Sequence, residues 1–343
     1  MKVAPKFKGD SDDWLDNERL GKKGRKRPQK VVQARGLDLP WIQANATVEE
    51  VYPKQCRVRM DGEGQAFLCS YRWAEIMNRS KTEARERTPV CVGDRVLVDT
   101  EDHRSGVVTG ICSRKNSLVR PAPGRDGQKH YHALAANLDV LVIVASVTEP
   151  EFSPGLIDRF LIAAEVQKIP VLICASKMDL WKVQGTKPLW KDYSDLGYEV
   201  LPVSSRDLVG IELLRQKISE KTAAFCGQSG VGKTSLLRVL LNREVGRVAE
   251  VNPLTGKGRH TTTGAVLLEA SRGSRWIDTP GVREFGLVNL VPEDLPEYFP
   301  EFRSLACRSS GCLHHAPEQC EASTLFRYAS YLRILKSLQE ETS

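Results

Sequence analysis

Hydrophobic and polar residues alternate in short runs over the first third of the chain. These runs are ATVEEVY from Ala46, CRVRM from Cys56, AFLCS from Ala66, Asp94–Asp99 and Gly106–Ile111. Alternating strands rich in β-branched residues and separated by turns, such as Asp61–Gly64, are typical of a small closed barrel. Five such strands in this length predict an oligonucleotide-binding (OB) type β-barrel over residues 37–115.

From residue 136 the pattern changes to continuous apolar runs that alternate with helical spacing. The runs Asp139–Ala145 and Pro170–Ala175 are typical of strands buried on both faces of a parallel sheet. Pro154–Val166 has apolar residues near helical spacing. Further strands are predicted at Tyr198–Leu201, Thr222–Cys226 and Thr263–Leu268, and helices at Trp190–Leu196, Ile211–Ile218 and Ser235–Leu241. This alternation predicts a doubly wound α/β domain over residues 136–290.

Three further segments complete the predicted organisation. A polar stretch rich in proline and glycine predicts a linker over residues 116–135. Residues 291–343 form a C-terminal domain with a predicted helix at Glu321–Leu338. Residues 1–36 form a basic arm, in which Arg19–Arg35 holds eight basic residues and no acidic one. Such a block repels itself when free; it is either a solvated tail or an arm that neutralises nucleic-acid phosphates.

Composition indicates a protein of the reducing cytoplasm. The 343 residues carry a net charge of +7 and nine cysteines, six of them scattered, mostly inside apolar runs. No apolar run approaches the roughly 20 residues of a membrane span. The charged N-terminus has no apolar signal segment. We therefore expect a cytoplasmic protein without membrane contact.

The stretch GQSGVGKTS fits the phosphate-loop pattern G-x-x-x-x-G-K-[ST] between a predicted strand and a predicted helix. Glycines let backbone N–H groups surround a phosphate, and the helix N-terminus favours its negative charge. Lys233 is expected to reach the β- and γ-phosphates, and Thr234 to bind Mg²⁺. The strand–loop–helix context disfavours a chance match. The predicted nucleotide-binding residues here are Gly227, Gln228, Ser229, Gly230, Val231, Gly232, Lys233, Thr234 and Ser235.

Two loops that precede the phosphate loop predict which base is bound. Asp179 follows a buried strand, where ligand sites of α/β sheets lie, and its carboxylate can accept from the N1–H and N2 amino groups of guanine. The base-binding residues are Ser176, Lys177, Met178 and Asp179, with Ser204 and Ser205 in a second loop. The first group resembles the guanine motif N-K-x-D, with Ser176 in place of Asn. We expect a weakened but surviving guanine preference.

Two switch-like segments follow the phosphate loop. Asp278-Thr-Pro-Gly281 comes after a strand and resembles the D-x-x-G motif, in which the Asp binds Mg²⁺ through water and the Gly meets the γ-phosphate. One of the threonines in the segment Gly258–Thr263, assigned here as Thr262, is expected to complete the Mg²⁺ shell, unless this stretch simply begins the next strand.

The base loops come before the phosphate loop, whereas in the usual order of these motifs they come after the switches. This rotated order is a circular permutation. One consequence is that the second switch, starting at Asp278, is expected to run directly into the C-terminal segment without being held from both sides.

A cluster near the C-terminus has the spacing of a metal site. Cys307, Cys312 and Cys320 surround the pair His314 and His315. Three thiolates and one imidazole suit tetrahedral Zn²⁺ with no open position, which predicts a structural site. Reduced cysteines in a small core are the alternative, although this polar segment has little else to bury.

The rotated order, with GQSGVGKTS, GRHTTT and DTPGVREFGL, resembles the circularly permuted GTPases. The preceding barrel and the cysteine cluster narrow the resemblance to the ribosome small-subunit-dependent GTPase A family, the RsgA/YjeQ type. It implies a monomeric GTP hydrolase that binds GTP and GDP and acts in late maturation of the small ribosomal subunit. The subunit and its rRNA would be the partners, the subunit would stimulate turnover, Mg²⁺ would accompany GTP, and one structural zinc would use His314 as its fourth ligand.

Val282 stands where many GTPases have the Gln that orients the attacking water. Its side chain cannot form a hydrogen bond, so another group must position the water. His260 resembles the histidine proposed for this role in the family and is the catalytic candidate. The alternative is a solvent-facing histidine on a mobile switch. Slow intrinsic hydrolysis is expected, rising when a partner orders the switch.

Two other function classes account for part of the sequence. An ATPase or phosphotransferase with an RNA-binding barrel leaves Asp179 and the rotated order unexplained. An RNA-binding scaffold with a weak or vestigial nucleotide site would bind subunits without turnover. In the barrel, Tyr71, Arg72 and Trp73 could stack bases, or Trp73 could cap the barrel core.

Overall fold

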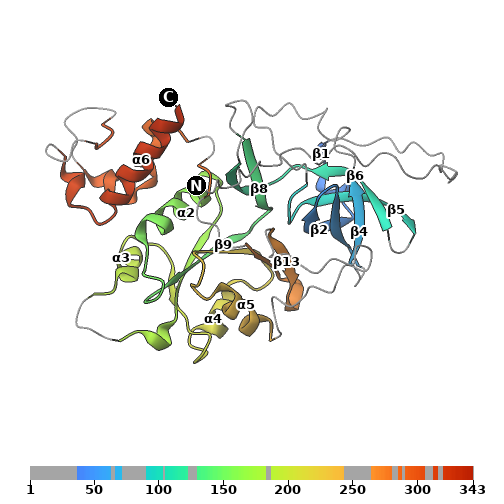
Figure 1. Ribbon diagram of the computed structural model, residues 1–343, viewed down its shortest axis with the longest axis horizontal. Coiled ribbons are helices and arrows are strands. Elements are labelled where there is room, and N and C mark those ends of the chain that lie inside the picture. Colours follow the sequence, from blue (N-terminus) through green and yellow to red (C-terminus); the bar gives the residue numbers. More distant parts are fainter. Residues whose placement is uncertain are drawn as a thin grey trace, which may run out of the picture. The chain divides into compact units, whose positions relative to one another are not determined.

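The computed structural model (Figure 1) describes part of the chain. The described residues are 37–62, 66–71, 90–102, 105–122, 130–182, 187–242, 264–279, 285–287, 290–305, 312–315 and 320–342. All of them belong to one compact unit, Ala34–Ser343. Within these ranges, every helix is too short or too polar to cross a membrane.

Five strands close into the predicted barrel. They are β2 (Ala46–Tyr52), β3 (Gln55–Met60), β4 (Ala66–Tyr71), β5 (Arg95–Asp102) and β6 (Ser105–Cys112). The strands pair in the ring β2–β3–β4–β6–β5, and β5 returns to β2. Because successive side chains of a strand point to opposite faces, Cys56 and Val58 are fully buried while Arg57 between them is exposed. A short β1 (Leu37–Leu39) runs parallel to β6, and the 3-10 helix η1 (Trp41–Gln43) follows it.

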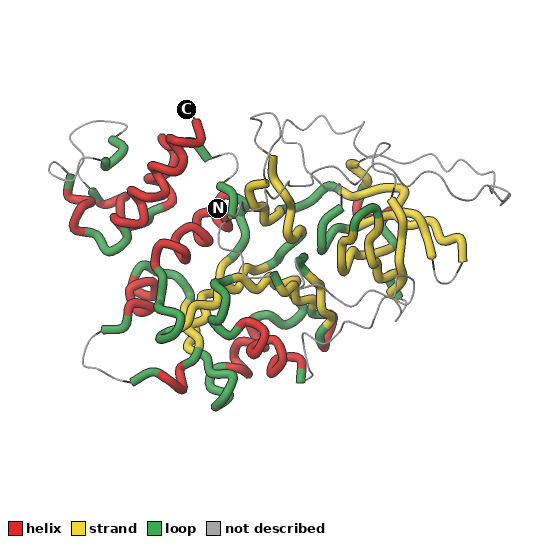
Figure 2. Tube along the Cα trace, in the orientation of Figure 1, coloured by secondary structure: helices red, strands yellow, loops and turns green. Residues whose placement is uncertain are grey.

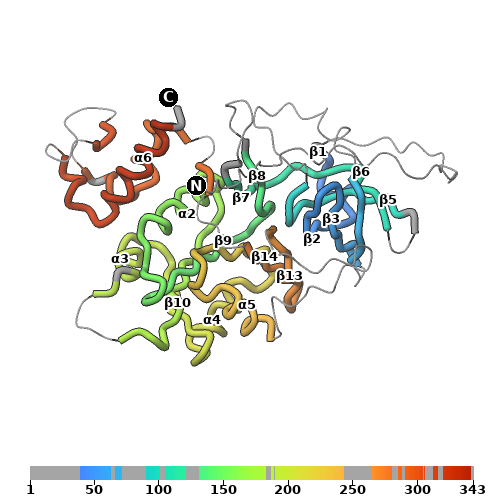
Figure 3. Tube along the Cα trace, in the orientation of Figure 1, coloured from blue at the N-terminus to red at the C-terminus, as the bar shows by residue number. Residues whose placement is uncertain are grey.

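The central sheet has the predicted α/β architecture, with strands and helices interleaved (Figure 2). Its strands are β9 (Val140–Ser146), β10 (Val171–Ser176), β11 (Val200–Pro202), β12 (Thr222–Cys226), β13 (Val266–Glu269) and β14 (Arg275–Asp278). Their order is β13–β14–β12–β9–β10–β11. Every neighbouring pair is parallel except β13–β14. In Figure 3, the orange strands β14 and β13 lie on the side of β9 away from β10.

The helices cover both faces of this sheet. They are α2 (Pro154–Val166), α3 (Leu189–Asp195), α4 (Ile211–Lys217) and α5 (Lys233–Leu241), with short 3-10 turns η2 (Met178–Leu180) and η3 (Ser271–Gly273). Leu141 and Ile143 of β9 share a core with Phe160 of α2. Val142 of β9 packs in a second core with Leu236 of α5. The continuous apolar run of β9 is therefore explained by burial on both faces.

The stretch predicted as a linker, residues 116–135, instead contains most of a hairpin. Its strands are β7 (Ser117–Ala122) and β8 (His130–Ala136), which pair antiparallel. Leu118 and Leu134 are buried in the core that also contains α2. Both strands are edges of a two-stranded sheet, where a proline such as Pro121 is tolerated. The proline and glycine content predicted a linker, whereas β7 forms a strand that pairs with β8.

The C-terminal part is built from 3-10 turns and one helix. The elements are η4 (Pro292–Tyr298), η5 (Pro300–Ser304), η7 (Glu321–Thr324) and α6 (Tyr328–Thr342). The helix predicted over Glu321–Leu338 is instead a 3-10 turn, a break and a 15-residue helix that begins later and extends to Thr342. The break contains Arg327, which is fully buried and lies 2.7 Å from the Asp158 carboxylate of α2. This tertiary ion pair overrides the local helical periodicity.

Candidate nucleotide and metal sites

The phosphate loop joins β12 to α5 at the carboxyl edge of the sheet. Gly227 has φ +142°, and a Cβ at this position would lie 2.2 Å from the Val144 carbonyl oxygen, so only glycine fits. Gly232 also has positive φ, at +97°, just before α5 begins. The loop therefore has the backbone shape that turns N–H groups toward one point, at the N-terminus of a helix.

Lys233 and Asp278 bring opposite charges into the buried edge of this loop. The Lys233 Nζ donates to the carbonyl oxygens of Gly227 at 2.7 Å and Gln228 at 2.9 Å. Burial lowers the pKa of Lys233, and the Asp278 charge partly offsets this effect. Burial likewise raises the pKa of Asp278, with Lys233 opposing. Thr234 is exposed in the first turn of α5. A cation, a carboxylate and an open hydroxyl are suited to a phosphate–Mg²⁺ group.

The residues predicted to bind the base lie at the same edge of the sheet. Asp179 Oδ1 accepts from the Ser204 hydroxyl at 2.8 Å, and Ser204 also accepts the backbone N–H groups of Arg206 and Asp207. Lys177 has a left-handed backbone and donates to the Glu149 carbonyl oxygen. Ser204 therefore fixes the orientation of the carboxylate that would read a base. Ser205 is partly buried beside it.

Ser176 makes the contact that links the base loop to the phosphate loop. Its hydroxyl donates to the Val231 carbonyl oxygen at 2.7 Å, and the side chain is 5% exposed. In this structure, the Ser176 hydroxyl therefore bonds to the phosphate loop.

Ser176→Ala is expected to weaken GTP binding about tenfold, because a buried carbonyl oxygen would lose its donor. Ser176→Asn is expected to bind GTP at least as well as the native chain, since its amide can donate to the same oxygen. Fluorescent-nucleotide titration measures both. Ser194→Ala, at an exposed position of α3, is the matched control. Unchanged affinity in Ser176→Ala would contradict the role of this bond.

The second switch is held at both ends, contrary to the expectation from sequence. At its start, the Thr279 hydroxyl donates to the Phe225 carbonyl oxygen at 2.7 Å. At its end, Phe285 is fully buried and Gly286 N–H donates to the Val119 carbonyl oxygen at 2.9 Å. The core around α2 supplies the second anchor, which the order of motifs along the chain could not reveal.

Several predicted site residues lie outside the described residues. They are Thr261, Thr262 and Thr263, the catalytic candidate His260, Gly281 and Val282 of the second switch, and Cys307. Their roles stay predictions. Arg72 and Trp73 also lie outside, whereas Tyr71 is 7% exposed and its hydroxyl donates to the Tyr52 carbonyl oxygen at 3.1 Å. Tyr71 is therefore a core residue of the barrel.

Cys312, His314 and Cys320 come together as the spacing predicted. Their ligand atoms all lie within 4.8 Å of one another, and His314 Nδ1 is 3.1 Å from Cys320 Sγ. The backbone N–H of His314 donates to Cys312 Sγ at 3.4 Å. His314 is 5% exposed, whereas the neighbouring His315 is exposed. Two sulfurs and a buried imidazole at this spacing fit a tetrahedral zinc ion, with Cys307 as the predicted fourth ligand.

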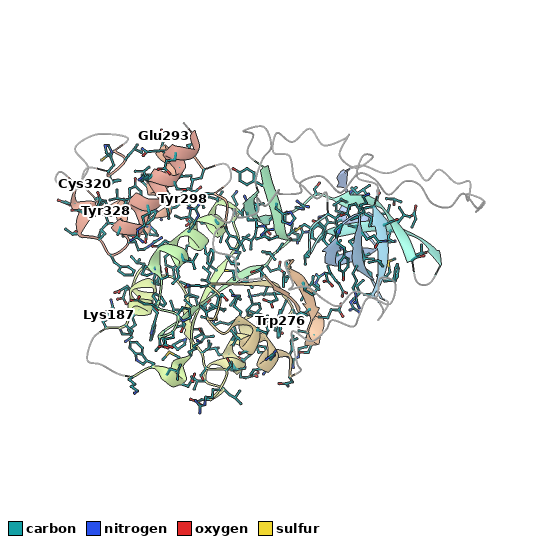
Figure 4. The ribbon with its side chains drawn as sticks, in the orientation of Figure 1. Lys187, Trp276, Glu293, Tyr298, Cys320 and Tyr328 are labelled. Carbon is teal, nitrogen blue, oxygen red and sulfur yellow. The ribbon has the colours of Figure 1, made fainter. Side chains whose placement is uncertain are left out.

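Aromatic residues of the C-terminal part support the cluster. The hydroxyls of Tyr328 and Tyr331 on α6 donate to the carbonyl oxygens of His314 and Leu313. The Phe302 ring lies 4.9 Å from the His314 ring. Figure 4 shows Tyr328 and Cys320 in this same C-terminal part. The sequence pattern gave the helical positions of the tyrosines but not their bonds to the cluster backbone.

Comparisons with known proteins agree with this geometry. A family model described as RsgA GTPase matches residues 111–288. The small ribosomal subunit biogenesis GTPase RsgA of Hahella chejuensis is 34% identical over 343 residues, covering 95% of this chain and 93% of that protein. Its counterpart in Chlorobaculum tepidum is 37% identical over 267 residues, covering 73% of this chain and 86% of that protein.

Solved structures match as well. The crystal structure of YjeQ from Thermotoga maritima superposes with a TM-score of 0.61 at 28% identity, covering 86% of this chain and 98% of that chain. The structure of YloQ, described as a circularly permuted GTPase, gives a TM-score of 0.58 at 26% identity, covering 86% and 94%. The permuted order predicted from sequence is confirmed by this similarity.

Proposed function

This chain belongs to the RsgA GTPase family and hydrolyses GTP, and from that premise we propose that its nucleotide state controls docking on the small ribosomal subunit. The observation that supports nucleotide binding most directly is the convergence of Lys233, Asp278 and Asp179 at one sheet edge. The proposed partner rests on the relatives, which are named small ribosomal subunit biogenesis GTPases. A role in late subunit maturation would place the protein where small subunits are assembled.

We assign the phosphates to the loop Gly227–Ser235, with Lys233 donating to the β- and γ-phosphate oxygens. The Ser204-held carboxylate of Asp179 would accept from the guanine N1–H and N2 amino groups. Thr234 and Asp278 would hold Mg²⁺, and Gly281 would donate to the γ-phosphate. When bound, Mg²⁺ supplies charge that stabilises the phosphate oxygens during transfer. To reach the phosphates, Lys233 Nζ would exchange its bonds to the Gly227 and Gln228 carbonyl oxygens for bonds to phosphate oxygens.

Water positioning is proposed for His260, because Val282 cannot form a hydrogen bond. A catalytic group must lie within hydrogen-bond reach of the water that it orients. Switch segments of GTPases are commonly ordered by their partners, and such ordering would bring a group into this reach more often. The proposal therefore includes slow intrinsic hydrolysis and stimulation by the subunit.

The zinc cluster is proposed to hold one structural zinc ion per chain through Cys307, Cys312, His314 and Cys320. A site with four protein ligands has no open position for a substrate. We propose that the barrel and this zinc-binding part contact rRNA, and that the protein acts as a monomer.

The test is GTP turnover with and without purified small subunits. We expect stimulation by about 100-fold or more, the scale at which a partner completes a GTPase site. ATP in place of GTP is expected to give no stimulated turnover. Subunit binding that ignores the nucleotide, with no stimulated turnover, would support the scaffold function instead.

His260→Ala in the same assay tests the water-positioning role. We expect it to lose about 100-fold or more of stimulated turnover and to keep GTP affinity, since general catalytic groups act in the transition state. His315→Ala is the matched histidine control, with normal turnover expected. Normal stimulated hydrolysis by His260→Ala would remove His260 from the mechanism and leave the GTPase function itself intact.

A further inference from the structure

Phe285 anchors the far end of the second switch to helix α2. Its ring is fully buried and lies 4.7 Å from the Phe160 ring, centroid to centroid. Aromatic pairs at this distance attract each other beyond what their buried area alone supplies. Phe285 stands four positions after Gly281 in the sequence. Any displacement of Phe285 is therefore close, along the chain, to the residue expected at the γ-phosphate.

Arg159, the residue directly before Phe160 in α2, also holds Phe285. Its Nε donates to the Phe285 carbonyl oxygen at 3.1 Å. The same guanidinium reaches helix α6, where Nη1 lies 3.5 Å from the Ser337 hydroxyl oxygen. The second contact is longer than an ordinary N–H···O bond and is weaker. One planar group thus touches the switch end and the C-terminal helix at once.

Other contacts hold α6 firmly against α2. The buried Arg327–Asp158 pair lies at the start of α6. Near the start of α2, a Cβ at Gly155 would lie 3.6 Å from the Ser330 hydroxyl oxygen, so the helices approach closely. At the other side of α6, Tyr328 and Tyr331 bond the backbone of the zinc cluster. A continuous set of contacts joins the cluster, α6, Arg159 and Phe285.

We propose that Arg159 is a positioning residue for GTP hydrolysis, holding the Phe285 backbone at α2 while the same guanidinium contacts helix α6. The inference rests on the proposed function in one respect, namely that hydrolysis responds to how the second switch is placed. Through this guanidinium, the C-terminal part influences turnover without touching the nucleotide. The fork geometry matters, because lysine has no planar set of donors that serves two acceptors at once.

Steady-state and single-turnover hydrolysis on the full-length zinc-loaded protein test this role. Arg159→Ala is expected to lower the kcat of GTP hydrolysis about tenfold while the Kd for GTP changes less than about twofold. Arg159→Lys should fall between Arg159→Ala and the native chain. Ser337→Ala, which removes only the longer contact, should lower kcat about twofold. Lys336→Gln, at an exposed neighbour on α6, is the matched control and should leave kcat unchanged.

The rate of hydrogen exchange at the Gly286 amide measures how firmly the end of the second switch is held, independently of activity. This amide donates to Val119, so its exchange should quicken in Arg159→Ala and stay native in Lys336→Gln. A native kcat in Arg159→Ala would overturn the proposal. If Arg159→Ala also lost GTP-binding stoichiometry, which reports misfolding, Arg159→Lys would decide, and a native kcat in Arg159→Lys would overturn the proposal.

The two proposals fail in different ways. If subunits do not stimulate the native chain, the proposed function fails, and intrinsic single-turnover hydrolysis still compares Arg159→Ala with the native chain. Unchanged Gly286 exchange in Arg159→Ala would overturn the anchoring role even where subunit stimulation is intact.

Discussion

Asp179→Asn is expected to weaken GTP binding by about 100- to 1000-fold and to transfer the preference to xanthosine triphosphate. Asparagine replaces one acceptor oxygen with an amide donor, which would face the donor groups of guanine. Xanthine carries a carbonyl oxygen where guanine carries its amino group, so it accepts from the new amide. A site built around hydrogen bonds rejects a base whose groups it leaves unpaired.

The structure favours this variant as a clean test of base recognition. Asp179 Oδ1 accepts from Ser204 at 2.8 Å, and the Asn carbonyl oxygen can accept the same bond. The loop should therefore keep its shape. Competition titrations with GTP, ATP and xanthosine triphosphate measure the change.

Asp207→Asn is the matched control for Asp179→Asn, because Asp207 is exposed in the neighbouring base loop. It should bind GTP as the native chain does. Native GTP affinity in Asp179→Asn would remove Asp179 from base recognition. Stronger competition by ATP than by GTP in the native chain would favour the ATPase reading.

His314→Ala is expected to reduce zinc affinity by more than about 100-fold and to destabilise the C-terminal part. Structural zinc sites of this kind contribute about 10–16 kcal/mol of apparent binding free energy at neutral pH. In the proposed zinc site, that energy would support the backbone to which Tyr328 and Tyr331 donate. Its loss should therefore loosen α6 as well as the cluster.

His315→Ala separates this effect from a general loss of histidine. His315 is exposed, whereas His314 is 5% exposed. Zinc content by elemental analysis should stay near one ion per chain in His315→Ala and fall to a small fraction in His314→Ala. In thermal unfolding, a chelator should lower the unfolding temperature of His315→Ala, which keeps its zinc, and should have little effect on His314→Ala, which has already lost it. Full zinc content in His314→Ala would mean that another group completes the site.

The other cysteines should not compete for the metal. Burial raises the pKa of Cys174 and Cys226, and it raises the pKa of Cys69 to about 12. Thiols that stay protonated are poor metal ligands and poor nucleophiles. Their scattered positions in apolar runs had already indicated this from the sequence.

Local features of this protein were readable from the sequence because they depend on local backbone requirements. The phosphate loop needs glycines at fixed offsets, and Gly227 indeed has φ +142° with no room for a Cβ. Unbroken apolar runs predict buried strands such as β9. Helix α2 begins and ends at the residues that its periodicity predicted. Motif order alone revealed the permutation.

Features that depend on distant partners were decided only by the tertiary structure. The hairpin β7–β8 forms in a stretch whose proline and glycine content predicted a linker, because its two strands pair with each other and bury Leu118 and Leu134. The start of α6 moves to Tyr328 because Arg327 pairs with Asp158, far away in the chain. Chain order predicted that the second switch is held at one side only, whereas packing of Phe285 against Phe160 holds its other end as well. A residue's own neighbours in sequence carry no record of such contacts, since their energy exists only after the chain has folded.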